Sequence, residues 1–297
     1  MLKKIAITIL VLMFSGCSTI AVDLPPVSET PTDIRDVGRV IWHDLLTTTP
    51  EASRKFYGEL FGWTFEAPRI HTGLGGDNDY MLIRHNGRLI GGMVDANVLR
   101  RDVNISQWIT MISVDDIDAA VGRVVENGGT VLTEPTALMS RGSLAVLADT
   151  TGALFAMIQT NSGDPVAHEP EMNAFLWDEL WTDDVTGASA FYQPVFGYQE
   201  QGLSTNDSLQ DYLALGNGTR PQVGILANPF ADERPVWVNY LRVADPAAIT
   251  SRVEGLGGRI IVAAQDRDIG GQVAFVAGPS GAGIALQTWP LNAEKEE

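Results

Sequence analysis

His43 is the first residue in the chain whose type and position could support metal chemistry. It lies in the segment IWHDLLTTTPEASRKFYGELFGW, residues 41–63, in a short apolar strand directly before a helix. Because imidazole binds divalent transition metals, His43 is a candidate first ligand. Asp44 follows it, and a carboxylate in an apolar pocket can act as a general base or bind a cationic group. The chemistry available here depends on which of these two side chains faces a ligand.

The pattern around His43 recurs in the second half of the chain. The segment LWDELWTDDVTGASAFYQPVFGY, residues 176–198, repeats residues 41–63 at an offset of 135. A second pair, WITMISVDDIDAAVGRVVENGGTV from Trp108 and WVNYLRVADPAAITSRVEGLGGRI from Trp237, has an offset of 129. Landmarks that repeat in the same order indicate two equivalent domains, and the change of the offset from 135 to 129 indicates short loop deletions.

Each domain is predicted to contain two copies of one pattern, in which a strand is followed by a helix and then by three strands. In the first domain, an alternating strand over 40–46 precedes a helix over 50–60, for which Thr49 is the expected N-cap. A second helix is expected over 115–127, before a pair of glycines that would end it. Single helices separated by runs of three strands are compatible with an α+β fold.

Four such modules with FY…FGW, VDD…GG and D-x-x-G landmarks resemble the vicinal oxygen chelate superfamily. This superfamily includes glyoxalase I, the bleomycin and fosfomycin resistance proteins and the extradiol dioxygenases. The resemblance covers residues 36 to about 290. It implies tandem glyoxalase-like domains, in which the four strand-helix-three-strand modules form two curved-sheet cups that hold the substrate.

The resemblance also implies where a metal would bind. The superfamily's first ligand lies fourteen residues before the Phe of FY, which is Trp42 in this chain, so His43 comes one residue too late. Because strand side chains alternate between faces, His43 is expected to point away from the cup unless a β-bulge shifts the strand. The other ligand positions are also non-ligating, namely Ile109, Ala156, Trp177, Val238 and Ala285. The sequence therefore predicts no metal and no cofactor, and solvated surface positions for His71, His85 and His168.

The same alternation predicts the lining of the cups. The first cup is expected to be lined by Trp42, Asp44, Ile109, Met111, Ser113, Ala156 and Ile158, and the second by Trp177, Glu179, Trp181, Val238, Tyr240, Arg242, Ala285 and Gln287. An apolar cavity with a few polar groups is typical of a small-molecule site. The candidate ligand-binding residues are Trp42, Asp44, Trp177, Glu179, Tyr240, Arg242 and Gln287. Alternatively, the tryptophans fill the cups and Glu179 pairs with Arg242, because buried charges are usually paired.

Composition limits the partners that the protein can have. The 297 residues are 45% hydrophobic, which is enough for packed cores, and the formal net charge is −17. Nucleic acids are not expected as partners, because phosphate binding needs a basic surface.

The N-terminal residues, MLKKIAITILVLMFSG, combine two lysines, an apolar run and small residues before Cys17, the only cysteine. This pattern is typical of a secretion signal. FSGC resembles the lipobox of bacterial lipoproteins, which implies lipidation of Cys17; a secreted protein with an unmodified cysteine is the alternative. Inner-membrane lipoproteins usually carry Asp directly after the lipidated cysteine, whereas this chain has Ser18. The resemblance therefore implies an anchor in the outer membrane, with the protein facing the periplasm. The expected segments are a signal peptide 1–16, an extended tether 17–35, domains 36–161 and 170–291, a linker 162–169 and an acidic tail 292–297.

Three functions remain open at this point. The first is a lipid-anchored envelope protein that binds a small organic ligand without metal. The second is a lyase or dioxygenase of the superfamily, or a metal-free catalyst that uses Asp44 or Glu179. The third is an envelope scaffold whose cups are filled. The absent ligand positions argue against the metal enzyme, and the repeated W-x-[DE] element favours binding.

We expect Cys17→Ser to release the protein from membranes, because the lipid would be its only anchor. Stable attachment normally needs more than one acyl chain, which the lipoprotein modification supplies. Cell fractionation tests this prediction, and a mutant protein that stays in the membrane pellet would contradict it.

Overall fold

The computed structural model describes residues 23–68, 79–99, 103–201, 212–218, 220–230, 233–267 and 270–289. The predicted signal peptide, Cys17, His71 and the acidic tail lie outside these residues. No helix in the described part of the chain has the length and apolar character needed to cross a membrane.

The first domain contains two modules of one helix and four strands. The first module comprises β1 (Val40–Thr47), α1 (Pro50–Phe61), β2 (Thr64–Glu66), β3 (Tyr80–His85) and β4 (Arg88–Asp95), followed by the short α2 (Ala96–Leu99). The second comprises β5 (Gln107–Ser113), α3 (Ile117–Glu126), β6 (Thr130–Ala137), β7 (Gly142–Ala148) and β8 (Leu154–Thr160).

The second domain repeats this arrangement. Its modules comprise β9 (Phe175–Thr182), α4 (Val185–Phe196), β10 (Gln199–Gln201), β11 (Tyr212–Gly216) and β12 (Val223–Ala227), then β13 (Val236–Arg242), α5 (Pro246–Val253), the 3₁₀ turn Glu254–Leu256, β14 (Arg259–Asp266), β15 (Gln272–Ala277) and β16 (Gly283–Gln287). The first helix begins at Pro50 as predicted. The second begins at Ile117, later than expected, because the side chain of Asp116 caps it by accepting from the amide of Ala119.

Each domain forms one curved sheet of eight strands, in the orders β2-β3-β4-β1-β5-β8-β7-β6 and β10-β11-β12-β9-β13-β16-β15-β14. The first strands of paired modules, β1 with β5 and β9 with β13, are antiparallel neighbours at the centre of each sheet. The predicted α+β fold of tandem glyoxalase-like domains, with four modules in two curved sheets, is confirmed.

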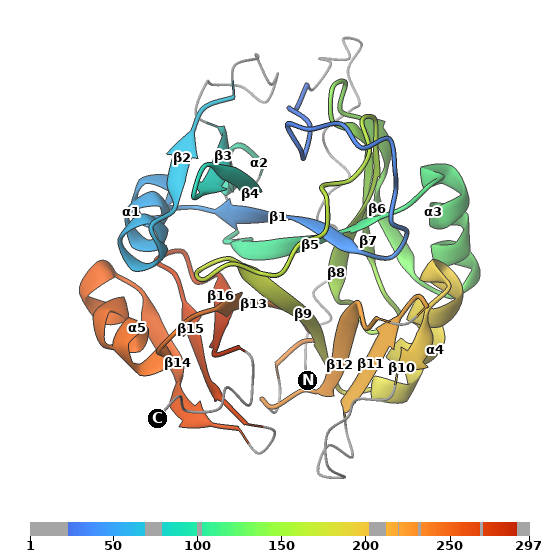
Figure 1. Cartoon of the computed structure of the whole chain (residues 1–297). Helices are drawn as coiled ribbons and strands as arrows, with labels where there is room; N and C mark the ends of the chain where they lie inside the picture. The colour runs from blue at the N-terminus through green and yellow to red at the C-terminus, as the bar shows by residue number, and fades with distance from the viewer. Residues whose placement is uncertain are drawn as a thin grey trace.

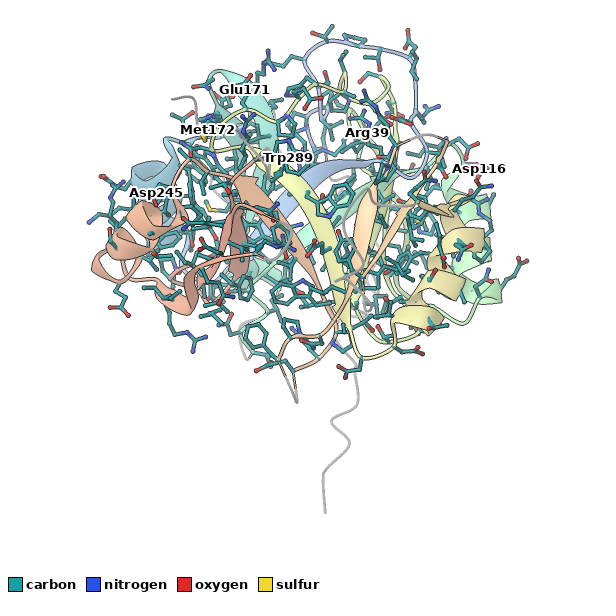
Figure 2. All side chains as sticks on the ribbon, turned by 60° about the horizontal axis from the view of Figure 1, so that its bottom comes forward. Arg39, Asp116, Glu171, Met172, Asp245 and Trp289 are labelled. Carbon is teal, nitrogen blue, oxygen red and sulfur yellow. The ribbon has the colours of Figure 1, made fainter. Side chains whose placement is uncertain are left out.

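The two sheets lie back to back, with helices on both flanks (Figure 1). On one flank α1 lies beside α5, and on the other α3 lies beside α4, so helices from different domains cover each side. The capping residues Asp116 of α3 and Asp245 of α5 accordingly appear on opposite flanks in Figure 2. Each flank has its own apolar core, and both cores contain residues of both domains. Neither domain completes its core alone.

A buried polar cluster joins the backs of the two sheets. His43 Nε2 lies 2.9 Å from Asp178 Oδ1. Asn239 Nδ2 donates to the same oxygen at 2.6 Å and to Thr110 Oγ1 at 2.7 Å. The His43 ring also stacks on Phe175, with ring centroids 3.8 Å apart. The four polar residues come from the central strands β1, β5, β9 and β13, and His43 and Asp178 occupy equivalent positions in the repeat.

The cluster determines which way His43 points. A register shift does occur in β1, between Val40 and Trp42, but Trp42, His43 and Asp44 then alternate regularly against β5. His43 thus faces the other domain, as predicted, and not the cup. The prediction of a solvated His85 is wrong: this residue is 8% exposed, and its Nε2 contacts the carbonyl of Met172 at 2.8 Å, because the segment before β9 covers it. His168 is exposed as expected.

We expect Asp178→Ala to destabilise the protein by about 3 kcal/mol, because two buried donors lose their acceptor. Asp183→Ala, an exposed change just beyond the same strand, serves as the control and should shift stability by at most about 0.5 kcal/mol. Urea unfolding measures both values. Equal midpoints for the two variants would show that the cluster does not hold the domains together.

Candidate functional site

The first cup is filled by its own side chains. Trp42, Ile109 and Ala156, which occupy the superfamily's ligand positions, share one buried apolar cluster with Met111 and Ile158. Ser113 is fully buried as well. The predicted lining residues therefore do come together, but they pack against one another.

The N-terminal segment closes this cup. Leu24 and Val27 belong to the same apolar cluster, and the amide of Leu24 donates to the carbonyl of Leu138 at 3.3 Å. Arg141 Nε donates to the carbonyl of Pro25 at 2.8 Å. This part of the expected tether is extended but is packed on the first domain, because Leu24 and Val27 have apolar surface to bury there.

Asp44 lies at the base of the first cup. It accepts from Trp42 Nε1 at 2.8 Å and from the hydroxyl of Tyr80 at 3.0 Å. Burial raises the pKa of Asp44, and the charge of Arg141 and these two hydrogen bonds oppose that shift. The guanidinium carbon of Arg141 lies 4.8 Å from the Trp42 ring centroid and 5.2 Å from that of Tyr80. The guanidinium of Arg141 thus lies over Trp42 and Tyr80, the two residues that donate hydrogen bonds to Asp44.

Glu179 occupies the equivalent position in the second cup. It is 2% exposed, and its Oε2 accepts from the hydroxyl of Tyr240 and from Trp181 Nε1, the latter at 3.4 Å. Trp177 Nε1 donates to the hydroxyl of Tyr212 at 3.0 Å. Burial raises the pKa of both Tyr212 and Tyr240 well above the usual range, and the charge of Glu179 raises it further. The phenols therefore stay protonated and available as donors.

Arg242 and Gln287 do not join this carboxylate. Arg242 Nη1 donates to the carbonyl of Pro170 at 2.7 Å, which ties β13 to the segment before β9. Gln287 accepts from Arg267, a residue that the sequence analysis did not single out. The alternative pairing of Glu179 with Arg242 does not occur among the described ion pairs. Glu179 is held by neutral donors instead.

A cavity of about 510 Å³ opens at one end of the second cup. Its lining includes Trp181, Phe230, Val236 and Phe275 on the apolar side, and Arg234 and Arg259 on the polar side. Trp181 connects the cavity to Glu179 through its indole hydrogen bond. The second cup therefore combines aromatic walls, a buried carboxylate and a cavity at one end.

Tyr80 and Tyr212 were missed as site residues, although the sequence contains a signal for them. The segments DYML and DYLA, which begin at Asp79 and Asp211, repeat at an offset of 132. The phenol of each tyrosine lies beside the carboxyl of its own cup.

The fold first defines the general class. Two eight-stranded curved sheets built from paired modules are the vicinal oxygen chelate fold. The Mn(II)-bound glyoxalase from Novosphingobium aromaticivorans has a TM-score of 0.57 at 16% identity and covers 86% of this chain and 83% of its own. A variant of homoprotocatechuate 2,3-dioxygenase from Brevibacterium fuscum has a TM-score of 0.57 at 14% identity, with coverages of 89% and 74%. At these identities the likeness concerns the fold.

Sequence comparison then identifies the family. A family model for a glyoxalase-like domain matches residues 41–158. CFP32 of Mycobacterium tuberculosis, whose name assigns it provisionally to the glyoxylases, is 30% identical over 241 residues, or 81% of this chain and 91% of CFP32. The anthracycline biosynthesis protein DnrV of Streptomyces peucetius is 28% identical over 271 residues, with coverages of 84% and 92%. The chain belongs to the glyoxalase-like family.

The residues present do not fit the metal that this fold implies. Trp42, Ile109 and Ala156 in the first cup offer no lone pair suited to a divalent ion, and neither do the equivalent residues Trp177, Val238 and Ala285 in the second. No group of three or more His, Cys, Asp or Glu side chains in the described ranges is arranged to hold a metal ion.

We expect the purified protein to contain no stoichiometric zinc, nickel, manganese or iron, because apolar side chains occupy all six ligand positions. Elemental analysis after mild dialysis measures this. One bound equivalent that is lost on His43→Ala would contradict the strand register described above.

Proposed function

We propose that the protein binds a small organic ligand in its second cup without the superfamily's metal, and that a lipid on Cys17 anchors it to the cell envelope. The main support for the binding function is the difference between the two cups. The first is closed by Leu24 and Val27, whereas the second leaves aromatic surface around a cavity of about 510 Å³.

The polar groups of the second cup suit a ligand better than a core. Glu179 is buried, and no Lys or Arg in the described part of the chain forms an ion pair with it. A buried carboxylate without a cation is costly, so a partner supplied by a ligand would be bound favourably. The neighbouring phenols of Tyr212 and Tyr240 can orient that ligand by hydrogen bonds.

The candidate roles follow from these contacts. Trp177 and Trp181 form aromatic walls on the two sides of Glu179, and Tyr240 fixes the carboxylate. Gln287 and Arg267 form a polar pair near the same phenols, since the charge of Arg267 acts on Tyr212 and Tyr240. Trp42 and Asp44, which the sequence analysis offered as ligand-binding residues, are assigned to the closed cup and a structural role.

Anchoring rests on the sequence of the N-terminus. The apolar run before Cys17 and the FSGC motif support a lipoprotein of the outer membrane that faces the periplasm. The packed segment that begins at Asp23 lies only six residues beyond Cys17. The first domain would accordingly be held close to the membrane surface.

The relatives suggest where to look for the ligand. DnrV is named for anthracycline biosynthesis and CFP32 for a glyoxylase. Anthracyclines and other polycyclic aromatic compounds therefore belong in the first screen. The catalytic alternative has one specific support, which is the buried Glu179 that could act as a general base.

A thermal-shift screen tests the binding function, because a ligand at 100 times its dissociation constant stabilises the folded state by about 2.7 kcal/mol. For compounds that raise the melting temperature, we expect binding to quench tryptophan fluorescence. Trp177→Ala should remove most of this quenching, because the indole of Trp177 forms a wall of the site.

The matched controls are Trp289→Phe, which changes an exposed tryptophan, and Asp44→Asn, which changes the equivalent carboxyl in the closed cup. Both variants should bind the compound as the wild type does. A compound whose binding is lost in Asp44→Asn and kept in Trp177→Ala would place the site in the first cup, against the proposal. A screen without any stabilising compound would favour the scaffold.

A further inference from the structure

The bases of the two cups are built at four equivalent positions, which hold a tryptophan, an acid, a tyrosine and a glycine. They are Trp42, Asp44, Tyr80 and Gly92 in the first cup, and Trp177, Glu179, Tyr212 and Gly224 in the second. In each cup the acid and the glycine face each other on neighbouring strands, at Asp44 with Gly92 and at Glu179 with Gly224.

The glycines are required by close packing. A Cβ atom at Gly92 would lie 2.1 Å from the Tyr80 hydroxyl and 2.2 Å from Asp44 Oδ1. At Gly224 it would lie 2.3 Å from the Tyr212 hydroxyl and 2.9 Å from the Cγ of Glu179. Contacts this short do not occur between real atoms, so the glycine of each cup makes room for the phenol and for the acid side chain on the neighbouring strand. The carboxyl of Glu179 extends beyond the Cγ atom that lies against Gly224.

The first cup shows what this arrangement accommodates. The guanidinium of Arg141 lies over the rings of Trp42 and Tyr80. Arg141 is fully buried, and its Nη1 and Nη2 have no hydrogen-bond partner among the described groups. The planar cation is therefore held by two aromatic faces and the nearby charge of Asp44, with Nε fixed by Pro25.

The second cup has no side chain at the equivalent position. Arg141 lies in a turn in which its amide donates to Leu138 and the amide of Leu138 donates to Gly142. The same two bonds recur between Gly270 and Arg267 and between Arg267 and Gly271. Gly270 thus stands where Arg141 stands, so this position of the second cup carries no guanidinium.

Exposure differs accordingly. Trp42 and Tyr80 are each 1% exposed, whereas Trp177 and Tyr212 are only partly buried. Arg267 occupies the position equivalent to Leu138 in this turn, and its guanidinium donates to Gln287 while its charge also acts on Tyr212 and Tyr240. Among the described residues, no arginine or lysine lies over the ring of Trp177 or Tyr212 as Arg141 does over Trp42 and Tyr80.

We propose that the second cup binds the planar cation of its ligand, a guanidinium or amidinium group, between Trp177, Tyr212 and Glu179, in the position that Arg141 occupies in the first cup. This inference rests on the proposed binding function of the same cup and names the chemical class of its ligand. In the first cup the chain's own Arg141 occupies the cation position. In the second cup a separate ligand would occupy it.

Benzamidine and benzamide provide the test on the wild-type protein. They share size and shape, but only benzamidine carries a planar cation. Titration calorimetry should give about tenfold tighter binding, or more, for benzamidine, because hydrogen bonds to a charged group contribute more than neutral ones. Equal affinities for the two compounds would overturn the inference.

Two variants locate the effect. Glu179→Gln keeps the shape of the side chain and removes its charge, so benzamidine binding should fall by about tenfold, with benzamide unchanged. Asp44→Asn, the matched change in the first cup, should leave both affinities as they are. A fall in benzamidine binding in Asp44→Asn, with none in Glu179→Gln, would show that the cation does not bind in the second cup.

The outcome separates this inference from the binding function on which it rests. If benzamidine fails to bind while other compounds stabilise the protein and depend on Trp177, the cup binds ligands of another class and only the inference is wrong. If no compound of any class stabilises the protein, the binding function itself is wrong. Tight benzamidine binding that depends on Glu179 supports both.

Discussion

Asp178 lies at the centre of the molecule, where the backs of the two sheets meet, and its buried carboxylate needs donors from both domains. His43 and Asn239 provide them. Because side chains alternate along a strand, placing the middle residue of Trp42-His43-Asp44 at this interface directs its two neighbours into the first cup. The same holds for Trp177-Asp178-Glu179 and the second cup. One polar contact between the domains thus sets the register that positions both carboxyl groups.

The sequence predicts the parts of the structure that depend on local rules. The repeat and the helix starts follow from the residues themselves. The two curved sheets are implied by the resemblance to the superfamily, and the direction of His43 follows from the superfamily's ligand spacing together with strand alternation. The closure of the first cup could not be derived, because Arg141 meets Pro25 from 116 positions away. His85 was misplaced for a similar reason, since its cover comes from Met172 in the next domain. Tyr80 and Tyr212 could have been found from the repeated DY pair.

The two domains share an architecture and differ in what fills it. In the first, Arg141, Leu24 and Val27 complete the cup, so its acid and aromatic residues contribute to stability. In the second, Gly270 occupies the position equivalent to Arg141, and Glu179 forms no ion pair with a Lys or Arg among the described residues. An arrangement that serves packing in one domain is thus free to serve recognition in the other. Apolar side chains occupy the superfamily's metal-ligand positions in both domains, so these positions do not distinguish the two cups.

The packing of Leu24 and Val27 on the first cup also affects the order in which the protein folds. These residues leave the ribosome before any strand of the first domain, yet their partners Leu138 and Arg141 are synthesised more than a hundred residues later. Closing so long a loop is slow compared with forming a local hairpin. The earliest part of the described chain is therefore among the last to reach its native place, and the first cup stays accessible to water and to other molecules until it does.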